Sequence, residues 1–337
     1  MIEIDGSQGE GGGQILRTSL SLAICTQQPF RIVNIRANRE RPGLMRQHLT
    51  AVNAAAKICD AEVDGAEIGS RSLAFRPGRL VAGNYSFDIG TAGSCTLVFQ
   101  TVLPALLIAD GESRVRIMGG THNNASPPFD FLARSFLPLL TRMGANVQLE
   151  LASFGFYPRG GGEIRSRIVP SKPLGALALT ARGALLRGYA EAYVAALPLH
   201  VAQRELEVIR RRLGFAQSDL LLRALPNDVV PGNAVTITLE YEHVTEVFTG
   251  FGEKGVSAEA VAECAAEDAR VYLAASAPVD EHLADQLLLP MALGSGGVFF
   301  ARTETPHLHS NAVVIERFTG RKVTMAQAGD CTEVRVA

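Results

Sequence analysis

The feature that most limits the fold of this chain is a plan of short strand-like and helical segments that recurs along it. The first copy is strand, helix, strand, helix and two strands, over residues 1–5, 15–25, 30–36, 44–59, 61–63 and 72–75. The pattern returns over 85–89, 95–109, 113–118, 130–143 and 146–151, and again from 281–293 through 298–302, 311–318, 322–325 and 332–336. Recurrence of this kind predicts three β-α-β-α-β-β units that pack their apolar helices against one another.

One stretch between the second and third copies breaks this rhythm. It contains a strand, a helix, a strand and a helix over 187–194, 202–213, 235–241 and 258–273, with enough apolar residues for its own core. We therefore predict an α+β protein built of α/β sandwich repeats. Residues 1–183 and 277–337 form the discontinuous repeat domain, and residues 184–276 form a smaller inserted domain.

Two glycine runs stand out within this plan. The first is Gly9-Glu10-Gly11-Gly12-Gly13 directly before an apolar helix, and the second spans residues 155–162. Glycine lets a backbone approach a ligand closely, and a helix start favours a phosphate. The first run lacks the lysine of a P-loop, and Gln14 replaces the last glycine of the dinucleotide motif. A phosphate cradle and a tight structural turn both remain open.

The charge pattern is local rather than global. Net charge is only −2, yet residues 31–48 hold five arginines against Glu40. This distribution favours one focused anionic ligand over a general nucleic-acid coat. Arg17, Arg36, Arg39 and Gln47 are the predicted clamp for a terminal phosphate, because arginine gives permanently charged, bidentate donors. The alternative is a solvated charged face, and Arg41 and Arg46 fit either interpretation.

The composition indicates a reducing location and no membrane partner. The five cysteines form no C-x-x-C pair, so we expect reduced thiols and a cytoplasmic protein. No apolar run reaches membrane length without a charge or break, and the N-terminal residues do not have a signal-peptide pattern.

His307 is a candidate nucleophile. A neutral imidazole can attack an activated phosphorus when its second nitrogen is held by an acceptor. From the sequence alone, however, an ordinary loop histidine is the more economical interpretation. A metal site with His309 is a third, but neither cysteine nor acid stands nearby at ligand spacing.

A series of motifs in order gives the chain a family resemblance. They are residues 9–17, 35–37 with 46–49, 93–96, 155–162, 284–286 with 289–292, and 306–308. Across nearly its whole length the chain resembles the RNA 3′-terminal phosphate cyclases. The resemblance implies three repeats like the C-terminal domain of translation initiation factor three, with a thioredoxin-like insertion. It also implies ATP-dependent conversion of an RNA 3′-phosphate to a 2′,3′-cyclic phosphodiester, through an adenylylated histidine and an RNA-phosphate-phosphate-adenosine intermediate.

The resemblance also implies roles for individual residues. His307 becomes the nucleophile, and Glu10 becomes a ligand for Mg²⁺ or Mn²⁺ rather than a solvated loop residue. The implied nucleotide pocket consists of Gln100, Pro127, His282, Asp285 and Gln286. RNA 3′-phosphate ends are the expected partner. The chain departs from the family at Phe154, where arginine or histidine is usual, and at His282, where tyrosine is common.

Two other classes of protein compete with this interpretation. One is a non-catalytic relative that binds RNA or assists ribosome assembly, although it would not need His307, Glu10 and Asp285 together. The other is an enolpyruvyl transferase, which also binds phosphate with arginines but has two balanced halves. Because every residue given a role lies outside 184–276, we expect the insert to be peripheral to the chemistry. The sequence predicts no oligomeric state.

Overall fold

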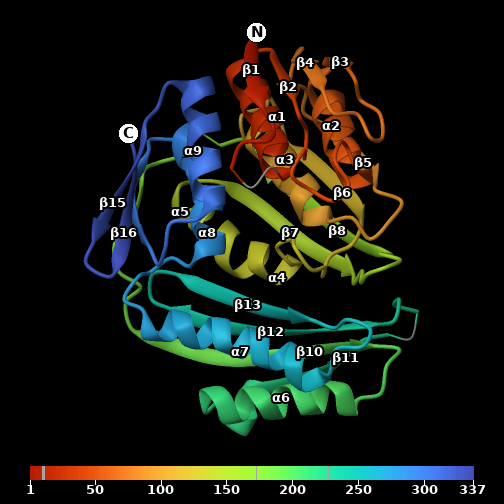
Figure 1. Ribbon diagram of the computed structural model, residues 1–337, viewed down its shortest axis with the longest axis vertical. Helices are drawn as coiled ribbons and strands as arrows, with labels where there is room; N and C mark the ends of the chain where they lie inside the picture. The colour runs from red at the N-terminus through yellow and green to blue at the C-terminus, as the bar shows by residue number, and fades with distance from the viewer. Residues whose placement is uncertain (10–11, 172, 227) are drawn as a thin grey trace.

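The computed structural model describes residues 1–9, 12–171, 173–226 and 228–337. It is a mixed α/β structure whose described strands form four-stranded sheets, with helices packed between and against them (Figure 1). None of the helices within these residues is both long enough and apolar enough to cross a membrane.

The first sheet is formed by the N-terminal part of the chain. Its strands, in the order β1-β2-β4-β3, are β1 (Ile2–Asp5), β2 (Phe30–Val33), β4 (Leu73–Arg76) and β3 (Glu62–Asp64). Helices α1 (Gln14–Thr26) and α2 (Arg46–Cys59) connect them. β2 ends three residues earlier than predicted, because Asn34 and Arg36 adopt positive φ angles of 55° and 54°.

The second sheet has the same arrangement. Its order is β5-β6-β8-β7, with β5 (Asn84–Asp88), β6 (Ser113–Gly119), β8 (Gly162–Val169) and β7 (Asn146–Ser153). Helix α3 (Cys95–Leu107) follows β5. The helix predicted over 130–143 is present, but it contains a π-helical turn: the segment is α4 (Phe129–Phe131), a π-helical turn (Leu132–Phe136) and α5 (Leu137–Arg142). Pro138 near the start of α5 has no N–H to donate, which prevents regular helical bonding there.

The third sheet combines segments from both sides of the central stretch. Its order is β15-β16-β14-β9, with β15 (Val323–Ala328), β16 (Cys331–Val336), β14 (Gly297–Ala301) and β9 (Leu177–Leu179), and its helices are α8 (Glu281–Leu293) and α9 (Pro306–Thr319). In all three sheets the first two strands in chain order pair in parallel and the remaining pairs are antiparallel. The sequence patterns did not predict β9, which has only three residues.

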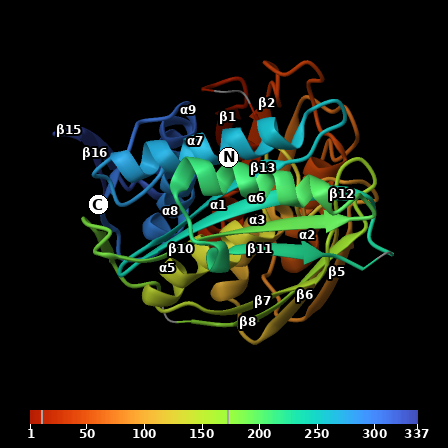
Figure 2. The ribbon, with the colours of Figure 1, turned by 90° about the horizontal axis from the view of Figure 1, so that it is seen from below.

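The fourth sheet differs from the other three. Its order is β11-β10-β12-β13, with β11 (Leu220–Ala224), β10 (Leu185–Ala195), β12 (Gly232–Tyr241) and β13 (Thr245–Phe251). Helices α6 (His200–Leu213) and α7 (Ala258–Ala274) lie side by side over it (Figure 2). They enclose a separate apolar core with the sheet. The sequence patterns predicted β10, β12, α6 and α7, but missed β11 and β13.

The other three sheets share one continuous core. Helix α1 lies at its centre, in contact with α2, α3 and α9, and most of its residues are buried. This packing brings the first and last parts of the chain together, as Figure 1 shows for α1 and α9. The position of α1 explains why it is buried on nearly all sides, including at its polar residues Thr18, Ser19 and Ser21.

The second glycine run serves backbone packing. A β-carbon at Gly155 would collide with the backbone nitrogen of Gly162. The two ends of the connection between β7 and β8 can therefore approach each other only because these residues have no side chains. None of these glycines lines the cavity described below. The structure therefore supports a structural role for this run, in which the glycines let two backbone segments approach closely, rather than a role in binding a ligand.

Candidate functional site

A cavity of about 1090 Å³ lies among the helices that extend from the first three sheets. The first or second turns of α1, α2, α3, α8 and α9 contribute Gln14, Arg17, Gln47, His48, Leu97, Gln100, His282, Asp285 and His307 to its lining. The start of a helix carries unpaired N–H groups and the positive end of the helix dipole. Convergence of several helix starts makes this cavity suitable for phosphate groups.

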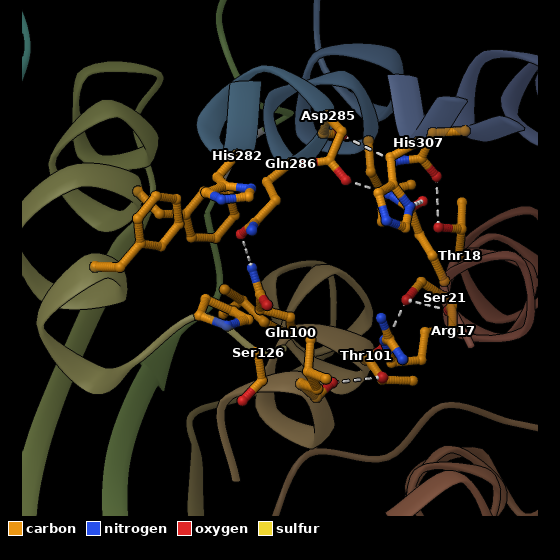
Figure 3. A pocket seen from close by; sticks show the side chains of 18 of the residues that line it. Arg17, Thr18, Ser21, Gln100, Thr101, Ser126, His282, Asp285, Gln286 and His307 are labelled. Atoms are coloured by element: carbon orange, nitrogen blue, oxygen red, sulfur yellow. Dashed lines mark hydrogen bonds between the residues drawn. The ribbon is translucent and has the colours of Figure 1, made fainter. Parts of the chain in front are cut away.

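The cavity gathers the predicted site residues from distant parts of the sequence. Those that line it are Arg17, Arg36, Arg39, Gln47, Gln100, Pro127, His282, Asp285, Gln286 and His307. Glu10, the predicted metal ligand, lies outside the described residues. Figure 3 shows His307, Asp285 and Arg17 on one side of the cavity and His282, Gln286 and Gln100 on the other.

His307 is held by a chain of hydrogen bonds. Its Nδ1 lies 2.5 Å from Oε1 of Gln14, and Nε2 of Gln14 donates to Oδ2 of Asp285. The carboxylate fixes the orientation of the Gln14 amide, so the amide oxygen faces His307 and accepts a hydrogen bond from Nδ1–H. In neutral His307 the proton is therefore on Nδ1, and the lone pair is on Nε2.

The backbone around His307 is also fixed. Thr305 caps helix α9 by accepting a hydrogen bond from the Leu308 N–H at 3.1 Å, and Pro306 occupies the first turn. Asn311, one turn further along, accepts from Thr18 Oγ1 at 2.6 Å and donates to the Asp285 carbonyl at 2.8 Å. Asn311 thus fastens α9 to α1 and α8, and holds the imidazole at a defined place.

Burial shifts the charges in the cavity away from their usual states. It raises the pKa of Asp285 to about 7, and nearby His282, Gln14 and Arg17 only partly offset this. It lowers the pKa of Arg17 to about 10. Burial, with the positive charges of Arg17 and Arg36, lowers the pKa of His48 to about 3, so its imidazole is neutral.

Arg36 and Gln47 also shape the cavity wall. Nη1 of Arg36 donates to the carbonyls of Arg41 and Gly43, at 2.5 and 3.0 Å. Oε1 of Gln47 accepts from the Ser94 N–H at 3.0 Å, which joins the start of α2 to the start of α3. Both side chains therefore have structural bonds in addition to their position in the lining.

The opposite side of the cavity is formed by amides and a proline. Gln100 on α3 donates to Gln286 on α8. Thr96 Oγ1 donates to the Pro127 carbonyl at 2.7 Å, which positions the proline ring at the wall. His282 is largely exposed, with 78% of its side chain accessible. This side offers a flat ring and amide groups, which suit a planar heterocycle.

The fourth sheet supplies part of the wall, which the sequence did not lead us to expect. Val247, Thr249 and Phe251 of β13 and Cys264 and Asp268 of α7 line the cavity. Two hydrogen bonds fix this unit to the loop before α4 and to the start of α8. Asn124 Nδ2 donates to Glu253 Oε1 at 2.6 Å, and the N–H of Asp280, which caps α8, donates to Glu246 Oε1 at 2.8 Å.

Sequence reasoning missed Gln14, His48 and Asn311. The sequence indicates Gln14 only as a departure from a glycine motif and as part of residues 9–17, and His48 only as part of residues 46–49. A β-carbon at Gly13 would collide with the His48 ring, so the glycine run and this histidine form one packed unit. No sequence signal identifies Asn311, because its partners are 293 and 26 residues away.

The described residues contain no group of three or more His, Cys, Asp or Glu arranged to bind a metal. Mg²⁺ commonly uses one or two carboxylates together with substrate phosphates and waters. A cavity with the ionisable Asp285 and several helix starts is compatible with such a metal-nucleotide complex.

Comparisons with known proteins point to one family. A family model described as RNA 3′-terminal phosphate cyclase matches residues 8–325. A protein of that name from Ralstonia nicotianae is 55% identical, over 99% of this chain and 96% of its own length. One from Koribacter versatilis is 52% identical, over 100% and 95%, and one from Salmonella paratyphi C is 50% identical, over 100% and 97%.

A solved structure also overlaps part of the chain. It is the enolpyruvyl transferase NikO from Streptomyces tendae, with a TM-score of 0.27, 14% identity, and coverage of 55% of this chain and 34% of its own. A likeness this slight carries no argument about fold or activity.

Proposed function

The chain belongs to the RNA 3′-terminal phosphate cyclase family, and from this premise we propose that His307 is the residue that accepts AMP. The family's reaction is the ATP-dependent conversion of an RNA 3′-terminal phosphate into a 2′,3′-cyclic phosphodiester, and this protein is such an enzyme. The observation that carries the assignment of His307 is its hydrogen-bond chain through Gln14 to Asp285.

The first step uses the tautomer that this chain sets. Nε2 of His307 attacks the α-phosphorus of ATP, an N–P bond forms, and the bond to pyrophosphate breaks. No proton needs to leave, because Nδ1 keeps its hydrogen and the ring becomes positive. The Gln14 oxygen that accepts this hydrogen stabilises the new charge, and Asp285 orients Gln14.

The later steps transfer AMP and close the ring. An oxygen of the RNA 3′-phosphate attacks the adenylyl phosphorus, the N–P bond breaks, and His307 regains its lone pair. The RNA 2′-hydroxyl then loses its proton and attacks the 3′-phosphorus, and AMP leaves. We assign Arg17, Arg36, Arg39 and Gln47 to the 3′-phosphate, since arginine offers charged donors to a phosphate dianion.

ATP occupies the same cavity in this proposal. Its adenine lies at the side formed by Gln100, Pro127, His282 and Gln286, and Asp285 lies near the sugar and phosphates. Glu10 would hold Mg²⁺ or Mn²⁺. Bound there, such an ion offsets phosphate charge and makes pyrophosphate a better leaving group.

We also propose a more detailed description of the fold. The first three sheets are copies of one unit, related to the C-terminal domain of translation initiation factor three, and their shared strand order and pairing directions support this. Residues 184–276 are an inserted, thioredoxin-like domain, which their separate core supports. We also propose a cytoplasmic location, consistent with five free thiols.

Labelling with ATP that carries ³²P at the α-position tests the proposal. Wild-type protein should take up label that is lost in acid and kept in alkali, as for a phosphoramidate. His307→Ala and His307→Asn should fold normally and take up none. His309→Ala is the matched control. His309 lies two residues further along the same helix, is exposed, and pairs with Glu304 at 2.9 Å. This variant should label like the wild type.

Two outcomes would contradict this assignment. One is label on His307→Ala at the wild-type level, and the other is label that maps to a residue other than His307. Either would leave the family membership intact but move the covalent step elsewhere in the cavity.

A further inference from the structure

A group of exposed arginines lies beside the cavity, outside the set assigned above. This arginine patch consists of Arg41, Arg46 and Arg71. Arg41 is tied to the cavity wall, since its carbonyl accepts from Nη1 of Arg36 at 2.5 Å. Arg46 directly precedes Gln47, which lines the cavity.

Arg71 joins the patch through backbone pairing. Its carbonyl accepts from the Ile35 N–H at 3.0 Å, and the Ser70 carbonyl accepts from the Leu44 N–H at 2.9 Å. The segment before β4 therefore lies against the segment that carries Arg36 and Arg41. The two segments thus form one backbone-paired unit next to Arg36, which lines the cavity.

The charge on this surface is not neutralised. Among the described residues, Arg41, Arg46 and Arg71 have no carboxylate within 4.0 Å. Several exposed arginines elsewhere are paired, among them Arg116 with Glu163, Arg167 with Glu112, and Arg204 with Glu259. Isolated exposed arginines without a carboxylate in this range, such as Arg211, also occur in the described part of the chain, so the distinguishing feature of the patch is three such residues on neighbouring segments. The adjoining segments 35–46 and 65–72 hold five arginines against Glu40 and Glu67. This excess of positive charge favours the binding of a polyanion.

We propose that the arginine patch binds the RNA backbone upstream of the 3′-terminal phosphate. This rests on the function proposed above, because it takes the terminal phosphate to enter the cavity beside Arg36 and Arg39. Single-stranded RNA carries one phosphate per nucleotide, so a strand that leaves the cavity mouth presents successive charges to the patch. Contacts of this kind do not read base sequence. The patch therefore sets affinity by RNA length rather than by sequence.

The test compares two RNA 3′-phosphates, a dinucleotide and an oligonucleotide of about twelve nucleotides. The variant is Arg41→Gln, Arg46→Gln and Arg71→Gln combined. The control is Arg211→Gln, Arg321→Gln and Lys322→Gln combined, which removes the same charge from residues that do not line the cavity. Measurements are KM for cyclisation of each RNA, the salt dependence of oligonucleotide binding, and AMP uptake.

In the patch variant, KM for the oligonucleotide should rise about tenfold, while KM for the dinucleotide and AMP uptake stay at wild-type values. The plot of log affinity against log salt for the oligonucleotide should become shallower by about 0.7 for each lost phosphate contact. The control variant should match the wild type in each measurement.

Three results would overturn the proposal. KM could rise equally for both RNAs, which would assign these arginines to the terminal phosphate. AMP uptake could fall, which would assign them to ATP. Oligonucleotide binding could be weakened equally in the control variant and in the patch variant. The effect would then come from the net charge of the protein and not from the position of these arginines. Failure of the wild type to cyclise either RNA would instead refute the proposed function, and binding of the oligonucleotide would still test the patch.

Discussion

The molecule contains two groups of buried polar side chains that are built in opposite ways. One joins the second sheet's helices to the fourth sheet and is called here the interface network: His122, Asp130, Arg134, Glu191 and Tyr193. The other lies in the cavity and is called the cavity cluster: Gln14, Arg17, His48, Asp285 and His307. Both combine acids, arginine and histidine from distant segments.

In the interface network the charges face one another. Asp130 lies 2.8 Å from Arg134 and 2.9 Å from His122, and Arg134 lies 2.6 Å from Glu191. Burial opposes ionisation of Asp130, but the bond with His122 and the charge of Arg134 still hold its pKa below the ordinary value. A network that satisfies each charge from within the protein has no need of a ligand.

In the cavity cluster, burial is not offset in this way. The pKa of Asp285 is raised to about 7, and that of Arg17 is lowered to about 10. These groups face a cavity rather than close partners of opposite charge. A phosphate anion would favour ionised Arg17, and a cation would favour ionised Asp285. The comparison teaches that the same residue types fix structure where they meet and prepare binding where a space separates them.

The largest expected effect is on the interface network. Arg134→Ala leaves Asp130 and Glu191 buried without their cation, which should lower the free energy of unfolding by about 3–5 kcal/mol. Folded molecules should still take up AMP. Denaturant unfolding and labelling per folded molecule measure the two effects. Arg204→Ala is the control, because its pair with Glu259 is exposed and its loss should change the free energy of unfolding far less. Equal losses for both variants would show that the interface network is not a special source of stability.

Asp285→Asn sharpens the comparison through pH. The pKa of Asp285 is raised from 3.8 to about 7 in the folded protein. The folded wild-type protein should therefore lose stability as pH rises between these values. Asparagine removes that loss. The melting temperature of Asp285→Asn relative to wild type should therefore rise from about pH 4 to about pH 7 and level off above. A difference that does not change with pH would show that Asp285 is not destabilised by burial.

Arg39→Ala tests the division between ATP and RNA in the cavity. Loss of a charge-assisted contact costs about 1.5–3 kcal/mol. This loss should reduce the rate of cyclisation, while AMP uptake largely persists. The two half-reactions are measured separately, with labelled ATP and with RNA 3′-phosphate. If AMP uptake falls as far as cyclisation, Arg39 serves the phosphates of ATP instead.

Gln14 provides the smallest and most specific effect. Gln14→Leu removes the acceptor for Nδ1 of His307 and should slow AMP uptake about 10–100-fold, as for other residues that orient a reacting imidazole. Gln14→Glu keeps an acceptor but sets a carboxylate against Asp285. Its rate should recover as pH falls and the pair of carboxylates takes up a proton. A pH profile parallel to that of the wild type would show that Gln14 does not act through this chain.

The sequence supported most predictions of helices and strands, because apolar periodicity is a local property. Helices α6, α7 and α8 and strands β10 and β12 lie close to the predicted ranges. The differences have local causes: a π-helical turn precedes Pro138 in one helix, positive φ at Asn34 ends one strand, and β9 is too short to show alternation. The segments β11 and β13 were also missed. Both are edge strands of the fourth sheet; β13 is mostly buried, whereas only Leu220 of β11 is buried.

Two things were determined by the sequence itself: the recurring plan of elements and the presence of residues with the right chemistry, among them His307, Asp285 and the arginines. The tertiary structure decided which of these residues meet. His307 and Gln14 are 293 positions apart, and Gln14 and Asp285 are 271 apart, so no local pattern contains their hydrogen bonds. Packing of α1 against α9 brings them together, and burial then sets the pKa values of Asp285 and Arg17. The tautomer of His307 and the charge state of the cavity follow from that packing and from no single segment of the chain.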